Sequence, residues 1–435
     1  MKKFLTFFAA AAALVACNKT ADTIQAPGSR EVKFTVSNLY TVTTKTAIAD
    51  DSHVAIFAGA PINANNVQMT VDMEANATSG TLTPTVTNSL LWAVGQTTTA
   101  TNFFAIYPYE IGRTLAGDTE AEKYLEYDIA SASDVVYAND FLAAAKSQAP
   151  GTGDAPATVA LAFKHPFAKL VYNITNTSDD FVSGLKISGI RRTGHVMFTT
   201  GAAVPTGEAI AAADAVALNE NGTNSFMTVV MPETEAVNPL VVVEMASGAK
   251  YTFALSQAIA LEAGKVYTAS IAISGGHEAE VSDRTVYGSF TVTDWVNVDA
   301  GSMTGGTVTP ATKWWYLVGN IDAYGGTADG NWSKFVPFKC IGNDLWQVDF
   351  YFAGGNGFKL MYAANPPEWD YAYGMSSSDT WIIDPQYVYA EGAGNDYWVH
   401  GLTNVDGQDI NMSGTGNFRI KFTPSIMEFY IYKLN

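Results

Sequence analysis

Apolar and polar residues alternate at a period of two along much of the chain. Leu170, Tyr172 and Ile174, for example, would share one face of an extended segment. This is the pattern of a half-buried antiparallel strand. Comparable strings recur at 32–36, 54–57, 103–107, 240–245, 267–273 and 287–295. Only two short alanine-rich stretches, 141–146 and 208–216, favour helix. The pattern predicts an all-β fold.

A second set of strand patterns follows a change in composition. Residues 301–310 hold three glycines and a proline and few apolar residues, which predicts a flexible linker over 301–312. Further strand patterns lie at 315–319, 345–352, 418–422 and 428–432. The last two are close enough to form a hairpin. Residues 313–435 are therefore expected to form a separate β module.

The chain begins with the layout of an export signal. Two lysines precede an apolar run, 4–16, which is too short to span a bilayer as a helix and ends at Cys17. Leu14-Val15-Ala16-Cys17 resembles a bacterial lipobox, which implies cleavage before Cys17 and a diacylglycerol on its sulfur. An ordinary secretory signal with an incidental cysteine is the alternative. The small and polar residues 18–30 would then form a tether.

Charge and cysteine content restrict the partners. The formal net charge of −18, from 42 acidic and 24 basic residues, repels phosphate backbones, so nucleic acid is not expected as a partner. No later apolar run is long enough for a membrane helix, so the lipid on Cys17 is the expected contact with the outer membrane. Cys340 would then be a lone thiol and most simply a small buried residue.

No pattern of residues predicts catalysis. The chain has no serine nucleophile elbow and no phosphate-binding glycine loop followed by lysine. Glu368 and Asp370 are the residue types of a glycosidase pair, but neighbours on one loop rarely face each other across a cleft. The histidines, at positions 53, 165, 195, 277 and 400, lack ligand spacing. We therefore predict no enzymatic activity, no cofactor and no metal.

One segment carries a family resemblance. Residues 163–174, Phe-Lys-His-Pro-Phe-Ala-Lys-Leu-Val-Tyr-Asn-Ile, resemble the central signature of the fimbrillin family. Further strings in that family's order lie at 103–108, 134–138 and 290–295. The resemblance implies two stacked β-sandwich-like subdomains, here 31–160 and 161–300. It also implies assembly with pilin subunits by donor-strand exchange, in which an N-terminal strand, here 31–42, is replaced by a strand of the next subunit.

Two departures from the family bear on this assembly. No arginine lies between Arg30 and Arg113, so cleavage of the first strand by an arginine-specific protease is not supported, although Lys45 would serve a protease of other specificity. After Trp295, the linker and the module stand where stalk pilins have the segment that they donate. The second departure favours a fimbrial tip or accessory subunit over a stalk subunit, because a tip subunit need not donate a strand onward.

The C-terminal module is rich in aromatic residues. Seven of the nine tryptophans and eleven of the 21 tyrosines follow residue 312. Tyr316-Leu317-Val318-Gly319, then Trp332, Phe358-Lys359-Leu360 and the segment 369–374 resemble the starch-binding modules of the outer-membrane lipoproteins SusE and SusF. The resemblance implies an immunoglobulin-like, carbohydrate-binding-module-like β-sandwich and a glycan ligand, either an α-glucan or a host glycan.

A sugar site needs a flat aromatic platform with hydrogen-bonding groups at its rim, because sugar rings present apolar faces surrounded by hydroxyls. Trp369, Tyr371 and Tyr373 would lie on one face if their segment is extended. The resemblance makes Lys359 a hydrogen-bond donor to the sugar. The candidate ligand-binding residues are Trp332, Lys359, Trp369, Tyr371, Tyr373 and Trp381. The alternative is that most of these aromatic residues belong to the core.

Together these patterns predict a lipid-anchored adhesin of the fimbrillin type, at the outer membrane, cell surface or fimbrium. It would be a tip or accessory subunit that displays a C-terminal glycan-binding module. The alternative is a lipoprotein that does not polymerise and captures glycans for a polysaccharide-uptake system, with the fimbrillin-like body as a spacer.

Overall fold

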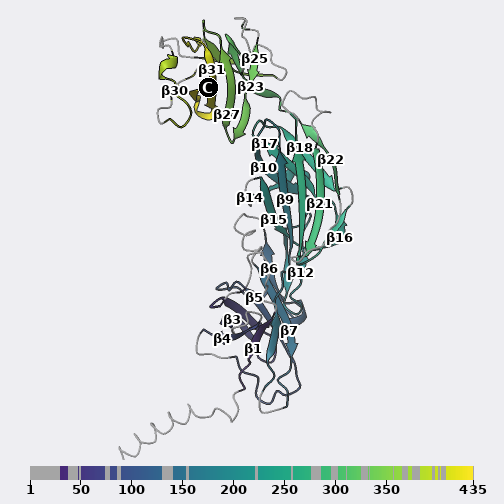
Figure 1. Cartoon of the computed structure of the whole chain (residues 1–435). Helices are drawn as coiled ribbons and strands as arrows, with labels where there is room; N and C mark the ends of the chain where they lie inside the picture. Colours follow the sequence, from purple (N-terminus) through teal and green to yellow (C-terminus); the bar gives the residue numbers. More distant parts are fainter. Residues whose placement is uncertain are drawn as a thin grey trace, which may run out of the picture. The chain divides into compact units, whose positions relative to one another are not determined.

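The computed structural model describes residues 30–37, 48, 50–73, 79–85, 90–129, 141–152, 156–220, 224–255, 258–275, 286–294, 302–309, 311–324, 332, 334–355, 357–364, 371–374, 383–393, 397–399, 402 and 408–434. Within these ranges the fold is all-β, as predicted, and short 3-10 turns are the only helical elements (Figure 1). No helix in the described part is long and apolar enough to cross a membrane. Cys17, the export signal and the tether lie outside these ranges.

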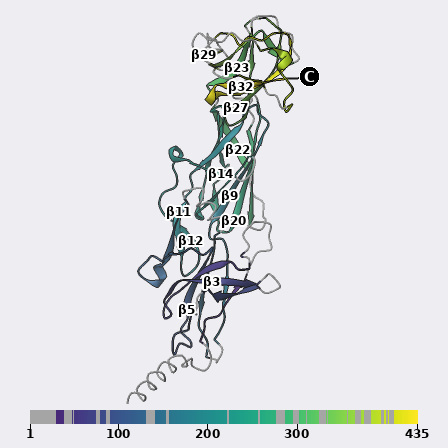
Figure 2. The ribbon, with the colours of Figure 1, turned by 90° about the vertical axis from the view of Figure 1, so that its left-hand side faces the viewer.

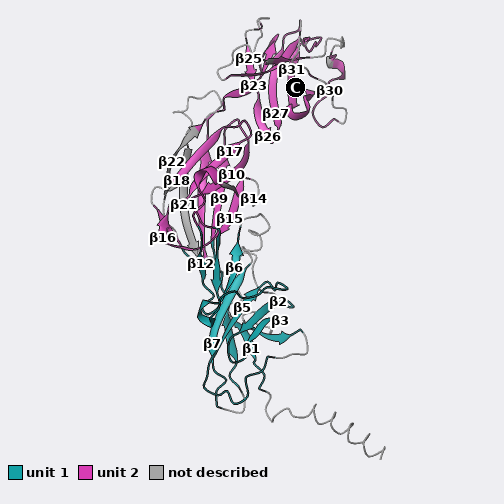
Figure 3. Cartoon of the chain, turned by 180° about the vertical axis from the view of Figure 1, so that it is seen from behind, with its two compact units in different colours: residues 1–168, 192–207, 262–264 teal, residues 169–191, 208–261, 265–435 magenta. Residues whose placement is uncertain are grey.

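The chain forms two compact units, coloured separately in Figure 3. Unit 1 contains residues Met1–Ala168, Arg192–Gly207 and Glu262–Gly264. Unit 2 contains Lys169–Arg191, Glu208–Leu261 and Lys265–Asn435. We call the part of the chain before Lys313 the body. Unit 2 therefore includes the second β-sandwich of the body and the C-terminal module.

Unit 1 is built on a seven-stranded sheet. The sheet order is β7 (Leu142–Gln148), β5 (Thr101–Tyr107), β2 (His53–Ala58), β3 (Ala64–Met73), β4 (Ser79–Pro84), β1 (Phe34–Ser37) and β8 (Val159–Ala162). A second sheet holds β12 (Ala203–Pro205), β11 (Thr193–Met197) and β6 (Tyr124–Asp128), and η1 spans Glu120–Glu122. The core contains Phe34, Val36, Trp92 and Phe103, which are all buried.

The body part of unit 2 is a ten-stranded sheet. Its order is β13 (Val216–Ala217), β10 (Val182–Ser188), β17 (Leu240–Met245), β18 (Lys250–Leu255), β22 (Ser302–Thr309), β21 (Val286–Asp294), β20 (Lys265–Ile273), β9 (Ala168–Asn176), β15 (Ser225–Val230) and β14 (Asn219–Glu220). Smaller elements are β16 (Glu233–Val237), β19 (Ile259–Leu261) and η2 (Ala212–Asp214). The predicted alternation in β9 is confirmed, since Leu170, Tyr172 and Ile174 are buried.

The C-terminal module of unit 2 has two sheets. The four-stranded sheet has the order β25 (Phe335–Pro337), β23 (Lys313–Gly319), β28 (Phe358–Ala364) and β29 (Tyr371–Tyr373). The other has the order β24 (Ile321–Ala323), β27 (Leu345–Phe352), β31 (Gly416–Thr423), β32 (Glu428–Lys433) and β30 (Tyr397–Val399), with β26 (Lys339–Gly342) also on β27. The turns η4 (Pro385–Tyr387) and η5 (Pro424–Ile426) complete it. Figure 2 shows β23, β27 and β32 in this module.

Two expectations from the sequence do not hold. Ser302–Thr309, within the predicted linker, forms β22, because its backbone pairs with β18 on one side and β21 on the other. The alanine-rich stretch at 141–146 forms most of β7 and not a helix, because it pairs with β5 along its length. Small side chains fit there against the buried Phe103 and Phe104 of β5. The stretch at 208–216 contains the turn η2 and ends at Val216, the first residue of β13.

Cys340 joins the module to the body within unit 2. Its backbone N–H donates to the Asp179 carbonyl at 2.9 Å, and Phe181 and Ala246 of the body pack against the module's core. The Cys340 side chain is buried, as predicted, and burial raises the pKa of its thiol to about 12. A thiol with this pKa is neutral at ordinary pH and behaves as a small apolar residue.

Candidate functional site

Most of the described tryptophans of the module are in its core. The side chains of Trp314, Trp315 and Trp346 are at most 7% exposed. Trp314 and Trp346 pack edge to face at 4.9 Å between ring centroids, across the two sheets, and the Trp314 Nε1–H donates to the Phe338 carbonyl at 2.6 Å. These three rings therefore belong to the core, and none of them is among the predicted ligand-binding residues.

Two predicted ligand residues also contact this core. Trp332 and Tyr373 are half-buried and pack against the module's buried cluster. The Tyr373 ring lies 5.4 Å from Trp315, centroid to centroid. Both rings therefore contribute to packing, and a role in ligand binding stays a prediction.

Three further candidates are described only in part or not at all. The Tyr371 backbone lies in β29, opposite Tyr362 of β28, but its side chain is not described. Trp369 and Trp381 lie outside the described residues. Whether these three side chains form one platform with Tyr373 stays a prediction.

Lys359 is held by a neighbouring carboxylate. Its Nζ lies 3.6 Å from the Oδ1 of Asp409, and its side chain is 23% exposed. Burial raises the pKa of the Asp409 carboxyl, and the charge of Lys359 opposes that rise. An ammonium group has three N–H donors, so Lys359 can keep this contact and still donate to a ligand.

The outer face of the six-stranded sheet carries a different pair of aromatic side chains. We use "outer face" for the outward side chains of β27, β31, β32 and β30. Trp398 of β30 and Tyr430 of β32 stand directly opposite each other in register and are 47% and 40% exposed. Side chains in such a pair have Cβ atoms about 5 Å apart. The two rings are therefore neighbours on an open surface.

A row of charged side chains continues the outer face beside Tyr430. Lys421 of β31 is opposite Tyr430, and Arg419 on the same strand binds Asp349 of β27 through two hydrogen bonds, each of 2.7 Å. Glu391 bridges the two cations, accepting from Arg419 at 3.1 Å and from Lys421. Its hydrogen bond with Lys421 is the main reason why the pKa of the Glu391 carboxyl is lowered.

Part of the outer face is covered. Tyr432 shares this face with Arg419, its partner in register, yet is only 6% exposed. The segment 384–393 reaches this part of the face, because its Glu391 contacts Arg419 and its Tyr389 carbonyl accepts from the Lys433 backbone at 3.0 Å. Tyr389 is itself 42% exposed. The exposed pair Trp398 and Tyr430 therefore lies next to the part of the face that this segment contacts.

Replacing Glu391 with glutamine is expected to lower the free energy of unfolding by about 0.2–1 kcal/mol, because exposed ion pairs contribute little. The pKa of Glu391 is lowered in the folded chain. Its contribution is therefore present at neutral pH and is lost as the pH falls through that lowered pKa. Urea unfolding of the wild type and the variant at neutral and acidic pH would measure both effects. A difference that is unchanged at acidic pH would contradict the ion-pair explanation.

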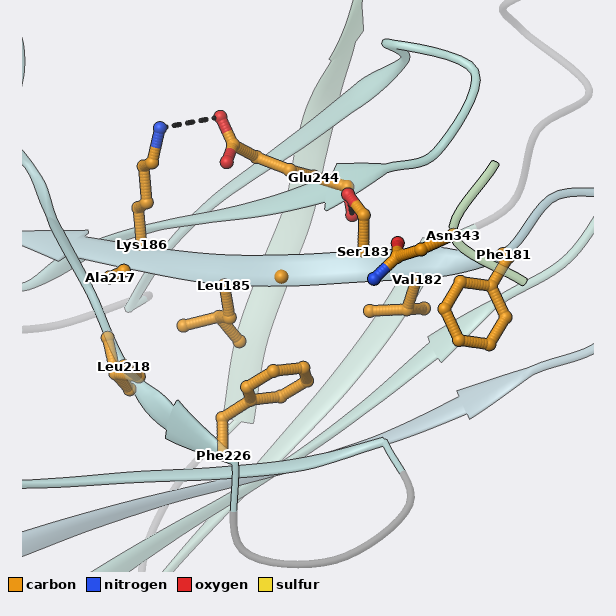
Figure 4. A pocket seen from close by; sticks show the side chains of 11 residues that line it. Phe181, Val182, Ser183, Leu185, Lys186, Ala217, Leu218, Phe226, Glu244 and Asn343 are labelled. Atoms are coloured by element: carbon orange, nitrogen blue, oxygen red, sulfur yellow. Dashed lines mark hydrogen bonds and ion pairs between the residues drawn. The ribbon is translucent and has the colours of Figure 1, made fainter. Parts of the chain in front are cut away.

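The body part of unit 2 contains a cavity of about 470 Å³ beside β10. Figure 4 shows the apolar side chains of Leu185 and Phe226 on one side of the strand, with the Lys186–Glu244 ion pair of 3.0 Å on the other. Ser183 and Asn343 also line this cavity, so its wall combines apolar and polar groups.

Metal binding has no candidate in the described part of the chain. No group of three His, Cys, Asp or Glu side chains in those ranges is arranged to hold an ion.

Trp398 and Tyr430 were not among the residues that the sequence predicts for binding. One signal for Tyr430 was present, since the alternation of 428–432 places its side chain on the face opposite to Phe429 and Ile431. No comparable signal separates Trp398 from the buried tryptophans.

Comparisons with known proteins identify a family for the body of the chain but not for the module. A family model described as Fimbrillin-like matches residues 37–295. No curated protein matches the chain. The family match therefore ends before the aromatic-rich module begins.

Several solved structures are similar over the same share of the chain. A candidate cell adhesion protein from Bacteroides uniformis is 20% identical, with a TM-score of 0.45, over 61% of this chain and 98% of that one. The tip fimbrial protein Mfa3 from Porphyromonas gingivalis, truncated at its C-terminus, is 11% identical, with a TM-score of 0.37, over 61% and 100%. A fimbrial assembly protein from Parabacteroides distasonis is 12% identical, with a TM-score of 0.38, over 64% and 98%.

Proposed function

Since the chain belongs to the fimbrillin-like family, we propose that it is a cell-surface adhesin, a tip or accessory subunit of a fimbrium that presents a glycan-binding module. The observation that carries this proposal is the C-terminal module. It lies beyond the family match, has its own hydrophobic core and leaves a tryptophan and a tyrosine side by side on an open sheet face.

The position of β1 supports assembly by strand exchange. β1 pairs antiparallel with β4 and parallel with β8, and its Phe34 and Val36 side chains are buried. Removal of such a strand would leave unpaired backbone groups on both neighbours and two empty side-chain sites. A strand from another subunit with apolar residues at alternate positions would fill that groove.

The strand β22 supports a terminal place in the assembly. β22 is already paired on both sides, and the module's first strand, β23, begins at Lys313, soon after β22 ends at Thr309. Residues 302–309, which follow the family match, are thus paired within this chain and would not be free for donation. A subunit of this kind can accept a strand without passing one on.

Replacing Cys17 with alanine is expected to move the protein from the membrane fraction to the soluble fraction, because the proposed anchor is a lipid on that sulfur. Immunoblotting of fractionated cells would measure the change, with Cys340→Ala as the control that leaves the anchor intact. If Cys17→Ala stayed in the membrane fraction, the lipid anchor would be excluded.

The two parts of the proposal are tested separately. Fractionation of fimbriae from cells that express the chain should recover it in polymers, and recovery only as an unpolymerised lipoprotein would favour glycan capture for uptake.

Titration of the full chain with α-glucans and with mucin glycans, followed by tryptophan fluorescence, tests the module. The absence of any response to these glycans would exclude the glycan-binding part.

A further inference from the structure

We propose that the outer face at Trp398, Tyr430 and Lys421 is the site where the module binds a neutral oligosaccharide, with the two aromatic rings as the platform. This inference rests on the proposed glycan-binding function and names its site. It differs from the cluster at 369–381 that the sequence pattern favours.

The exposure of the two rings is the first argument. Trp398 is the only tryptophan among the exposed large apolar residues in the described ranges, and Tyr430 is its direct neighbour across β30 and β32. Trp398 is outside the buried core cluster, and with 47% of its surface exposed it leaves a substantial apolar area in contact with water. Two adjacent rings offer the flat apolar area on which a sugar ring can stack.

The rings are held by their surroundings. The Trp398 Nε1–H donates to the Oε2 of Glu428 at 3.1 Å, which fixes the edge of the indole. The ring stands on β30, and β30 pairs with β32 through Tyr397, Trp398 and Val399. A platform that is ordered before binding loses less conformational entropy when a ligand is bound.

The charge around the rings favours a neutral ligand. Arg419 and Lys421 are the cations of the row, and Asp349 and Glu391 are the carboxylates that bind them. Glu428, which binds Trp398, adds a third carboxylate, so three negative and two positive side chains give this face a formal charge of −1, while the whole chain has a net charge of −18. Such a surface supplies many hydrogen-bond donors and acceptors for hydroxyl groups without attracting a strongly charged partner.

The segment 384–393 would limit the orientation of a bound chain. It contributes Glu391, which binds Lys421, and the exposed Tyr389. An oligosaccharide that stacks on Trp398 and Tyr430 would extend along Lys421, with its hydroxyl groups toward Glu391.

The test uses the full chain and a panel of probes: maltohexaose, cellohexaose, laminarihexaose, mannohexaose and neutral mucin oligosaccharides. Affinities are measured by calorimetry for the wild type, Trp398→Ala, Tyr430→Ala and Tyr324→Ala. Tyr324 is the matched control, because it is 52% exposed in the same module but follows β24, at the opposite edge of the sheet. Unchanged melting temperatures establish that each variant is folded.

We expect Trp398→Ala and Tyr430→Ala each to weaken binding of the recognised oligosaccharide by about tenfold or more, and Tyr324→Ala to leave it unchanged. If the wild type binds an oligosaccharide and Trp398→Ala binds it equally well, this site is overturned while the proposed function stands. Binding of no probe by the wild type would overturn both. Light scattering measures whether the chain forms a dimer. If the wild type binds no glycan but forms a dimer that Trp398→Ala abolishes, the face binds a second copy of the chain, and the proposal is overturned.

Discussion

Replacing Phe34 with alanine is expected to lower the free energy of unfolding of unit 1 by about 3–5 kcal/mol. The ring is 2% exposed and packs edge to face on Phe103 of β5, at 5.3 Å between centroids. Its loss would leave a cavity beneath β1, where that strand joins β4 to β8. Segment-resolved hydrogen exchange should show faster exchange in these three strands, with the C-terminal module unchanged.

Thr35→Ala is the matched control for this prediction. Thr35 lies on the same strand but is only half-buried and points to the other face, so the expected change is within about 0.5 kcal/mol. An equal effect of both substitutions would contradict the view that β1 is held by its buried side chains. If the prediction holds, β1 does not leave the sheet spontaneously, and strand exchange requires cleavage of the chain after it.

Replacing Trp314 with alanine is expected to lower the free energy of unfolding of the module by about 3–5 kcal/mol. Trp314 is 1% exposed and packs against Trp346, so its loss leaves a cavity between the two sheets. The Phe338 carbonyl would also lose the hydrogen bond from the indole nitrogen. Urea unfolding followed by circular dichroism, with segment-resolved hydrogen exchange to place the change, would measure the loss.

Trp398→Ala is the opposite case in the same module. Its ring lies on the outer face, so we expect the free energy of unfolding to change by less than about 1 kcal/mol while glycan binding weakens by about tenfold or more. A large loss of stability for Trp398→Ala would show that the exposed ring supports the fold, and its role as a ligand platform would lose its main argument.

Strand positions follow closely from the sequence, because alternation is a local property. The strings at 54–57, 103–107, 240–245 and 267–273 all lie within strands, namely β2, β5, β17 and β20. Each strand needs one buried face, and the spacing of its apolar residues records which face that is. No knowledge of the partner strand is needed for this step.

In two segments the observed secondary structure differs from the one that the residues prefer locally. Alanine favours helix, yet 142–148 forms β7, because its backbone pairs with β5 along the whole length of the strand. Glycines at 305 and 306 favour a flexible linker, yet 302–309 forms β22, because β18 and β21 present two edges with unmatched backbone groups. Hydrogen bonds to distant segments decided both cases.

By itself the sequence determined the all-β fold, the fimbrillin-like body and the concentration of aromatic residues in a C-terminal module. Only the tertiary structure decided which of those aromatic residues face water. Trp314 and Trp398 are chemically identical, and one is enclosed between two sheets while the other stands on an outer strand. The physical reason is that strand order and sheet stacking, which join residues far apart in the chain, determine what covers each ring.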